Sequence, residues 1–168
     1  MKLRTILMPI VCLFSVTNAV ADVDKGFACY MEKNYQCAFK EFLESAEQGD
    51  AFAQSEVGSM YGSGKGVKQD YLNAVEWYQK SADQGSEEGQ YSLGFAYEYG
   101  HGVKQDYVKA VEWYQKAADQ GYLFAKQRVL TLNKFLNCSK SAKTELFGVK
   151  IKSVSTTLEL VAKLIRSI

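Results

Sequence analysis

Proline and histidine are almost missing from this chain of 168 residues, since each occurs only once. The single proline, Pro9, lies near the N-terminus, so no proline ring interrupts a helix in the rest of the chain. The single histidine, His101, excludes a His-rich metal site and any catalytic Ser/His or Cys/His pair that does not contain it. We therefore expect no metal, no cofactor and no catalytic residue, and we interpret His101 as a solvated loop side chain.

Extremes of composition are also absent. Hydrophobic residues make up 47% of the chain and charged residues 23%, which are the proportions of an ordinary soluble domain. These values exclude a disordered, collagen-like or coiled-coil protein. The length is that of one domain or of a small repeat array.

The first 21 residues have the pattern of a secretory signal peptide. Two basic residues near the start precede an apolar run over residues 6–16, and small residues occupy positions 19–21. We expect cleavage after Ala21. The alternative is an uncleaved membrane anchor, but this run is shorter than the roughly 20 apolar residues that a span needs. The sequence thus predicts a periplasmic or secreted protein without a transmembrane span after cleavage, and without a nucleic-acid partner.

The sequence repeats itself with a period of 36 residues. Residues 51–86 and 87–122 are identical at 21 of 36 positions, and both contain the blocks VKQDY and AVEWYQK. A more diverged copy covers about 22–50, and a partial copy covers 123–136. We therefore predict a repeat domain over residues 22–136.

Each copy is predicted to begin with a helix. Gly58 and its equivalent Gly94 lie within this helix and would let a neighbouring helix approach closely. The apolar residues that share one helical face in the second copy are Ala53, Val57, Met60 and Tyr61.

A glycine-rich loop and a second helix follow in each copy. Asp70 and Asp106 stand where an N-cap would accept hydrogen bonds from free backbone amides. Gly85 and Gly121 are expected to end the helix in the left-handed conformation. The residues spaced for burial in the second copy are Tyr71, Ala74, Val75, Tyr78 and Ala82.

The pattern A-x-A-Q-x-x-V-G-x-M-Y-x-x-G-x-G-V-x-Q-D-Y-x-x-A-V-x-W-Y-x-K-x-A-x-x-G over residues 51–85 resembles the Sel1-like repeat, a relative of the tetratricopeptide repeat. The resemblance covers roughly residues 24–136. It implies an all-α fold, an α-solenoid of stacked helix-loop-helix units. It also implies an adaptor or scaffold that holds a protein or cell-wall partner, often in the bacterial envelope.

The same resemblance leaves two functional alternatives. A periplasmic component of the sodium-driven flagellar motor ring looks similar in length, leader and repeat count. Cysteine-rich Sel1-like proteins that have been described as penicillin-binding or β-lactamase-like are similar too, but they carry a cysteine pair in every repeat, whereas residues 51–122 contain no cysteine. A β-lactamase-like or peptidoglycan-acting hydrolase is therefore the alternative, and we expect a protein without enzymatic activity.

Two cysteines are predicted to form a disulfide. Cys29 and Cys37 flank Lys33 symmetrically, so a turn near residues 32–34 would bring them face to face between two antiparallel helices. An exported protein permits such a bond, and two buried free thiols are the alternative. Cys138 would then be free or bonded to another chain.

The outward residues of each first helix are candidates for partner binding, if these helices line the concave face as in tetratricopeptide repeats. Tyr91, Phe95 and Tyr99 lie at i, i+4 and i+8, where the preceding copy has serines. Aromatic residues dominate interface hot spots, although the C-terminal tail packing over them is the alternative. The candidate partner-binding residues are Phe52, Ser55, Ser59, Glu88, Tyr91, Phe95, Glu98, Tyr99, Phe124 and Arg128.

Charge is distributed unevenly along the chain. Residues 22–121 hold 17 acidic and 9 basic side chains, whereas residues 122–168 hold 2 acidic and 9 basic ones. The tail over residues 137–168 is predicted to form a short strand or hairpin near 147–152 and a helix near 158–165. This basic tail would contact an acidic surface, or it would attach to the acidic repeat domain.

Overall fold

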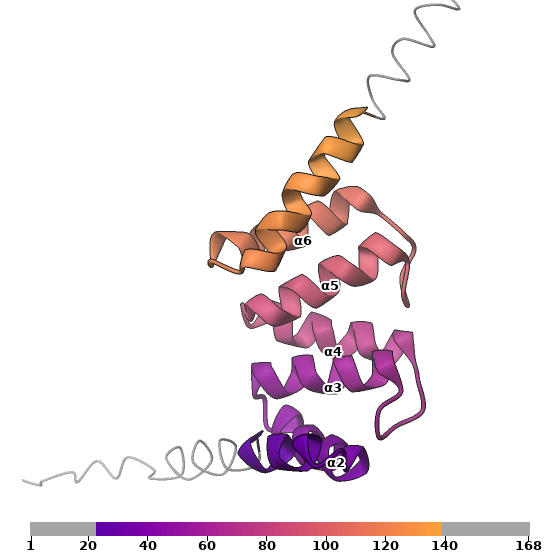
Figure 1. The fold of residues 1–168 in the computed structure, drawn as a ribbon, viewed down its shortest axis with the longest axis vertical. Helices are drawn as coiled ribbons and strands as arrows, with labels where there is room; N and C mark the ends of the chain where they lie inside the picture. The colour runs from indigo at the N-terminus through magenta and orange to yellow at the C-terminus, as the bar shows by residue number, and fades with distance from the viewer. Residues whose placement is uncertain (1–22, 139–168) are drawn as a thin grey trace, which may run out of the picture. The chain divides into compact units, whose positions relative to one another are not determined.

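A computed structural model describes residues 23–138, and within this range the chain forms seven helices and no strand (Figure 1). The signal peptide over residues 1–21 and the predicted strand and helix of the C-terminal tail lie outside the described residues. The all-α prediction is confirmed. The helices cover residues 23–31, α2 (Tyr35–Glu47), α3 (Ala51–Ser63), α4 (Tyr71–Asp83), α5 (Glu87–Tyr99), α6 (Tyr107–Asp119) and residues 123–138.

The described residues belong to two compact units that divide between Arg128 and Val129. Within the first unit, consecutive helices pack on one another in chain order from α2 to α6 (Figure 1). Helix α3 also contacts α5, which places the first helices of neighbouring copies side by side. This stack of two-helix units is the predicted α-solenoid. Within residues 23–138 no helix is long and apolar enough to cross a membrane.

Each second helix begins at its predicted N-cap. The Asp70 carboxylate accepts hydrogen bonds from the backbone amides of Leu72, at 2.9 Å, and Asn73, at 3.1 Å. The bond from the Asn73 amide contributes most to a pKa of Asp70 below its usual value. Asp106 caps α6 in the same way, with two bonds of 3.0 Å. These bonds satisfy amides that the helix itself leaves without acceptors.

Glycines fix both the ends of the second helices and their distance from the first helices. Gly85 and Gly121 follow α4 and α6 with φ of 87° and 110°, the predicted left-handed conformation. A Cβ atom on Gly58 would lie 2.6 Å from the ring of Tyr78, which is closer than real atoms approach. Gly58 is therefore needed for the close packing of α3 on α4, as predicted.

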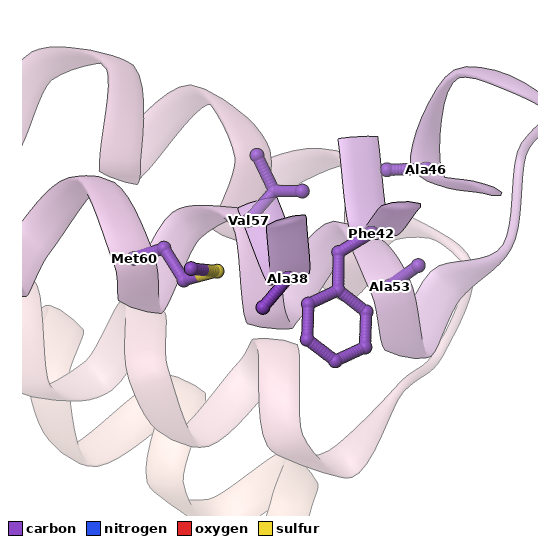
Figure 2. Packing of buried hydrophobic residues seen from close by; sticks show 6 residues of the cluster. All are labelled: Ala38, Phe42, Ala46, Ala53, Val57 and Met60. Atoms are coloured by element: carbon purple, nitrogen blue, oxygen red, sulfur yellow. The ribbon is translucent and has the colours of Figure 1, made fainter. Parts of the chain in front are cut away.

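A small apolar core joins α2 to α3 (Figure 2). Its largest side chain, Phe42, is fully buried and meets the ring of Phe27 edge-on, with centroids 5.4 Å apart. Full burial of one such side chain stabilises a fold by roughly 1.5–3 kcal/mol. The core residues labelled in Figure 2 are Ala38, Phe42, Ala46, Ala53, Val57 and Met60.

Polar contacts between neighbouring copies recur with the repeat. The Gln84 side-chain amide donates to the Gly49 carbonyl at 3.0 Å and to Gln54 Oε1 at 2.8 Å. Gln120 makes the same two bonds one copy later, at 2.8 and 2.9 Å. In both copies one of these bonds, to Gly49 or Gly85, crosses to the preceding copy, and the other, to Gln54 or Gln90, stays within the glutamine's own copy.

The helix over residues 23–31 and α2 are linked by the predicted disulfide. Cys29 and Cys37 are bonded, with their Cα atoms 5.7 Å apart. Lys33, midway between them, has φ of 61° and so reverses the chain in the left-handed conformation. Cys138 is exposed and forms no disulfide within the described residues.

Candidate partner-binding site

A pocket of about 220 Å³ opens in the first unit between α3, α4 and α5. Its walls are mostly apolar, and one of them comes from the loop after α5. We call it the α3–α5 pocket. The residues that line it are Ser59, Gly62, Ser63, Tyr71, Ala74, Val75, Tyr78, Phe95, Ala96 and His101.

A cluster of rings forms the rim of this pocket. His101 stacks on Tyr71, with centroids 4.5 Å apart, and lies 5.8 Å from the ring of Phe95 and 5.9 Å from that of Tyr99. The rings of Phe95 and Tyr99 are 4.4 Å apart. Phe95 is 38% exposed and Tyr99 47% exposed, so both keep a free surface beside the pocket.

Two expectations about the rim need correction. His101 is half-buried against Tyr71 and is not a freely solvated loop side chain. Tyr71, expected to be buried, is exposed, because its ring covers the histidine of the next copy and not the core. Gly102, next to His101, lets the loop approach Tyr71 closely. It has φ of 72°, and a Cβ atom on it would lie only 2.1 Å from the Tyr71 carbonyl oxygen.

A buried network lies behind the exposed rings. The Tyr114 hydroxyl donates to Glu98 Oε2 at 2.8 Å, and the Arg128 guanidinium donates to Glu98 Oε1 at 2.8 Å. Arg128 also donates to the hydroxyl of Tyr99. Burial, together with the Glu98 carboxylate, raises the pKa of the Tyr114 hydroxyl well above its ordinary value. Glu98 is buried, which corrects the expectation that it faces outward.

Ser55 is also buried, although it was among the expected outward positions. Its hydroxyl donates to the Phe52 carbonyl oxygen at 2.8 Å, so the side chain is turned back onto its own helix. Phe52 itself is half-buried, with its ring 5.5 Å from that of Phe27. Neither residue lines the α3–α5 pocket.

The predicted aromatic residues do not form one continuous stripe. Tyr91 is half-buried and packs against Tyr114 and Tyr122, at centroid distances of 5.2 and 5.1 Å. Phe124 is 70% exposed and lies 5.9 Å from the ring of Tyr122. Ser59 and Phe95 thus line the pocket and Tyr99 lies beside Phe95, whereas Phe52, Tyr91 and Phe124 lie elsewhere. Arg128 contacts Glu98 and Tyr99 and does not line the pocket.

Two carboxylates give this region a negative charge. Burial raises the pKa of the Glu56 carboxyl above its ordinary value; the charge of Glu88 raises it further, and Lys65 opposes the effect. Burial and the nearby Glu56 raise the pKa of the Tyr78 hydroxyl, which lines the pocket, to about 12. A cation would therefore be favoured beside the pocket. No three His, Cys, Asp or Glu side chains come together as metal ligands anywhere in the described part of the chain.

Among the lining residues that were not predicted to bind a partner are the three rings of Tyr71, Tyr78 and His101. Tyr71 and Tyr78 have the spacing of core residues, and His101 occupies a loop position where the preceding copy has Lys65. One feature of the sequence could have indicated His101: the loop of the preceding copy is otherwise similar but has Lys65 in place of the imidazole ring. This exchange marks a position that the repeat does not require for folding.

Comparison with known proteins identifies the repeat. The Sel1 repeat family matches residues 51–86 and 87–122. A protective antigen with an SLR fold from uropathogenic Escherichia coli is 32% identical, with a TM-score of 0.68, over 76% of this chain and 28% of that one. A Sel1 repeat protein from Oxalobacter formigenes is 31% identical, with a TM-score of 0.63, over 68% of this chain and 48% of that one.

A third structure supports the fold alone. Helicobacter pylori cysteine rich protein B is 22% identical, with a TM-score of 0.58, and the match covers 70% of this chain and 90% of that one. No curated protein matches the chain significantly. The chain spans less than half the length of the Escherichia coli and Oxalobacter proteins.

Proposed function

Because this chain is a Sel1-like repeat protein, a class that generally mediates protein–protein interaction, we propose that it is an exported adaptor that holds an envelope protein on its first-helix face. We define this face by α3, α5 and residues 123–128. A cell-wall polymer is the alternative partner. The function is non-covalent: the adaptor binds and positions its partner without changing it.

The exposed pair Phe95 and Tyr99 carries this proposal. Both rings stand at the rim of the α3–α5 pocket and keep more than a third of their surface in solvent. Burying a large aromatic side chain is among the strongest contributions to protein–protein affinity. The preceding copy forms the same helix with Ser59 and Ser63 at these positions, so the repeat fold does not require the rings.

Export to the periplasm or beyond is supported by two independent features. The disulfide between Cys29 and Cys37 is of the kind that persists in oxidising compartments. Residues 1–21 carry the pattern of a cleavable signal peptide. Fractionation of a producing bacterium followed by mass spectrometry tests both, since the exported protein would begin at Asp22 and contain one disulfide. A cytoplasmic protein with an intact N-terminus would contradict export.

The alternative function is that of a β-lactamase-like or peptidoglycan-acting hydrolase. Sel1 repeat scaffolds are generally not enzymes, and the ionisable groups of the network between Tyr114, Glu98 and Arg128 already bind one another. We expect purified protein to leave a chromogenic cephalosporin and labelled peptidoglycan intact. Turnover of either that disappears when one polar side chain is replaced would contradict the adaptor.

The experiment that tests the adaptor removes only the exposed rings. The variant Phe95→Ser/Tyr99→Ser carries the residues of the preceding copy, so its helix should form normally. The control Leu72→Ser/Val108→Ser removes two apolar side chains that are 67% and 58% exposed at the starts of the second helices. Circular dichroism would confirm that both variants fold.

Each protein would then be used to capture partners from a bacterial envelope extract. A partner retained by the wild type and the control but lost by Phe95→Ser/Tyr99→Ser is the expected result. Equal capture by all three proteins would contradict binding through the first-helix face and would move the interaction to the basic tail over residues 137–168.

A further inference from the structure

The α3–α5 pocket lies where residues 51–86 meet residues 87–122, which we call the first junction. The second junction is the place where residues 87–122 meet residues 123–128. Small side chains form part of the pocket wall. Ser59, Gly62 and Ser63 line it. Thirty-six residues later, the same three positions hold Phe95, Glu98 and Tyr99. The second copy therefore carries large side chains at the positions where the first of the two copies carries small ones.

The floor of the pocket shows the same difference in its polar contacts. Tyr114 donates its hydroxyl hydrogen bond to Glu98. The equivalent of Tyr114 in the preceding copy is Tyr78, and the equivalent of Glu98 is Gly62. The Tyr78 hydroxyl makes no hydrogen bond to any residue that the structure describes. It points toward the space beside Gly62, since a Cβ atom there would lie 3.4 Å from this hydroxyl. An occupant of the pocket would thus meet the unused hydroxyl of Tyr78 among mostly apolar walls.

The charges differ between the junctions as well. At the second junction Arg128 forms an ion pair with Glu98 at 2.8 Å and lies over the ring of Tyr99, with Cζ 5.7 Å from the centroid. One copy earlier the position of Arg128 is held by Ser92, so no cation is supplied from there. Glu56 precedes Ser63 by seven residues on α3, and Glu88 precedes Phe95 by seven residues on α5, so each carboxylate shares a helical face with a residue that lines the pocket. The first junction therefore has serines in place of Phe95, Tyr99 and Arg128. The cation that acts on Glu56 is Lys65, which donates a hydrogen bond to the Tyr30 hydroxyl at 2.6 Å.

We propose that the α3–α5 pocket binds a partner-protein segment with an aromatic side chain next to an arginine or lysine. The ring enters the space beside Gly62 and Ser63, next to the Tyr78 hydroxyl, and the cation meets Glu56 and Glu88. This inference rests on the proposed function and specifies the chemistry of the partner. The size fits, because an apolar cavity of about 150 Å³ already accepts benzene and this pocket measures about 220 Å³.

The test uses short peptides of defined sequence and the oxidised chain over residues 22–168. The main probe is the amidated peptide Gly-Ser-Arg-Tyr-Ser-Gly. One control peptide has alanine in place of tyrosine, and another has glutamate in place of arginine. Binding is followed by NMR titration. We expect shifts of the His101 and Tyr71 ring signals, and affinity roughly tenfold lower for each control peptide, because each lacks one hot-spot contact.

A matched variant closes the pocket with residues that the chain already uses. Gly62→Glu/Ser63→Tyr/Ser92→Arg transfers the side chains of the second junction to the first. The backbone at Gly62 tolerates a side chain, because a Cβ there makes only ordinary contacts, at 3.4 and 3.8 Å. We expect this variant to lose the peptide binding by about tenfold or more. Val108→Tyr, which adds an aromatic ring on α6 away from the pocket, should bind like the wild type. Ser63→Tyr alone is the fallback if the triple variant does not fold.

The outcomes separate this inference from the proposed function. Equal binding of all three peptides, or unchanged binding by the closed variant, would overturn the aromatic-cation specificity even if Phe95→Ser/Tyr99→Ser loses its captured partner. Conversely, selective peptide binding that the closed variant loses would support the pocket even if envelope capture does not depend on Phe95 and Tyr99. Peptide-induced shifts confined to residues away from the α3–α5 pocket, such as 103–109 in the loop before α6 and its first turn, would contradict the site.

Discussion

The hydroxyl of Tyr114 is hydrogen-bonded to the carboxylate of Glu98, 16 residues earlier, and this bond distinguishes two copies that are otherwise nearly the same. Tyr114 is fully buried, whereas its equivalent Tyr78 lines an open pocket. One pair of tyrosines in the same fold thus has two different environments. The contribution of the Tyr114–Glu98 hydrogen bond to stability can therefore be measured, with Tyr78 as an internal control.

The two tyrosines should respond differently to loss of the hydroxyl. Tyr114→Phe removes the hydrogen bond to a buried carboxylate, so we expect it to lower the free energy of unfolding by roughly 1–3 kcal/mol. Tyr78→Phe removes a hydroxyl with no protein partner among the described residues and should cost much less. Urea unfolding followed by circular dichroism measures both. Equal losses would show that the Tyr114–Glu98 bond contributes nothing net.

The disulfide should stabilise the first two helices. For a loop of this length, loss of the bond between Cys29 and Cys37 is expected to cost about 2.5 kcal/mol. Cys29→Ser/Cys37→Ser should therefore unfold at a lower temperature than the wild type. A reducing agent should lower the melting temperature of the wild type by the same amount. Cys138→Ser is the control, because Cys138 is exposed and unbonded. A double variant that reductant destabilises further would contradict this account.

Stability should depend on pH through Glu56. Its pKa is raised in the folded state by burial and then by Glu88, so the folded protein holds this proton to a higher pH than the unfolded chain does. Stability then falls as pH rises through the raised pKa. Glu56→Gln should melt at a higher temperature than the wild type at neutral pH, and the difference should vanish at acidic pH, where both states are protonated.

A control separates this effect from surface charge in general. Glu76 lies exposed on α4, and Glu76→Gln should change the melting temperature little at any pH. The same pH dependence in both variants would exclude Glu56 as its source.

Two glycines with similar backbone angles should differ in their tolerance of a methyl group. Gly85 has φ of 87° and free space around it, so Gly85→Ala should cost only the left-handed strain, roughly 1–2 kcal/mol. Gly102 has φ of 72°, but a Cβ there would lie 2.1 Å from the Tyr71 carbonyl oxygen. Gly102→Ala should therefore be clearly more destabilising and should change the NMR signal of the His101 ring. Equal melting temperatures would show that the loop adapts.

Local features of the sequence predicted the helices but not the contacts between copies. Asp70 and Asp106 cap their helices, and Gly58 admits Tyr78, because these effects act over a few residues or between adjacent helices. Glu98 was misplaced because its partner Arg128 lies 30 residues away, in the next copy. Helical periodicity describes one helix and contains no information on which neighbour covers it.

The same limit explains the candidate site. The spacing of Phe95 and Tyr99 correctly placed their rings together on one exposed face. It could not show that His101 from the loop and Tyr71 from the preceding copy complete the rim, because their stacking also bridges 30 residues. The comparison of the copies showed the serines at positions 59 and 63, but not that they and Gly62 line one pocket, because that depends on how α3, α4 and α5 pack.

The recurring bonds of Gln84 and Gln120 have a consequence for how such a chain changes in length. Each glutamine reaches back to the start of its own copy's first helix and to the turn before it. A genetic duplication of 36 codons would therefore deliver these hydrogen bonds together with the new helices. Only the outward side chains of the new copy would then be left for selection to alter.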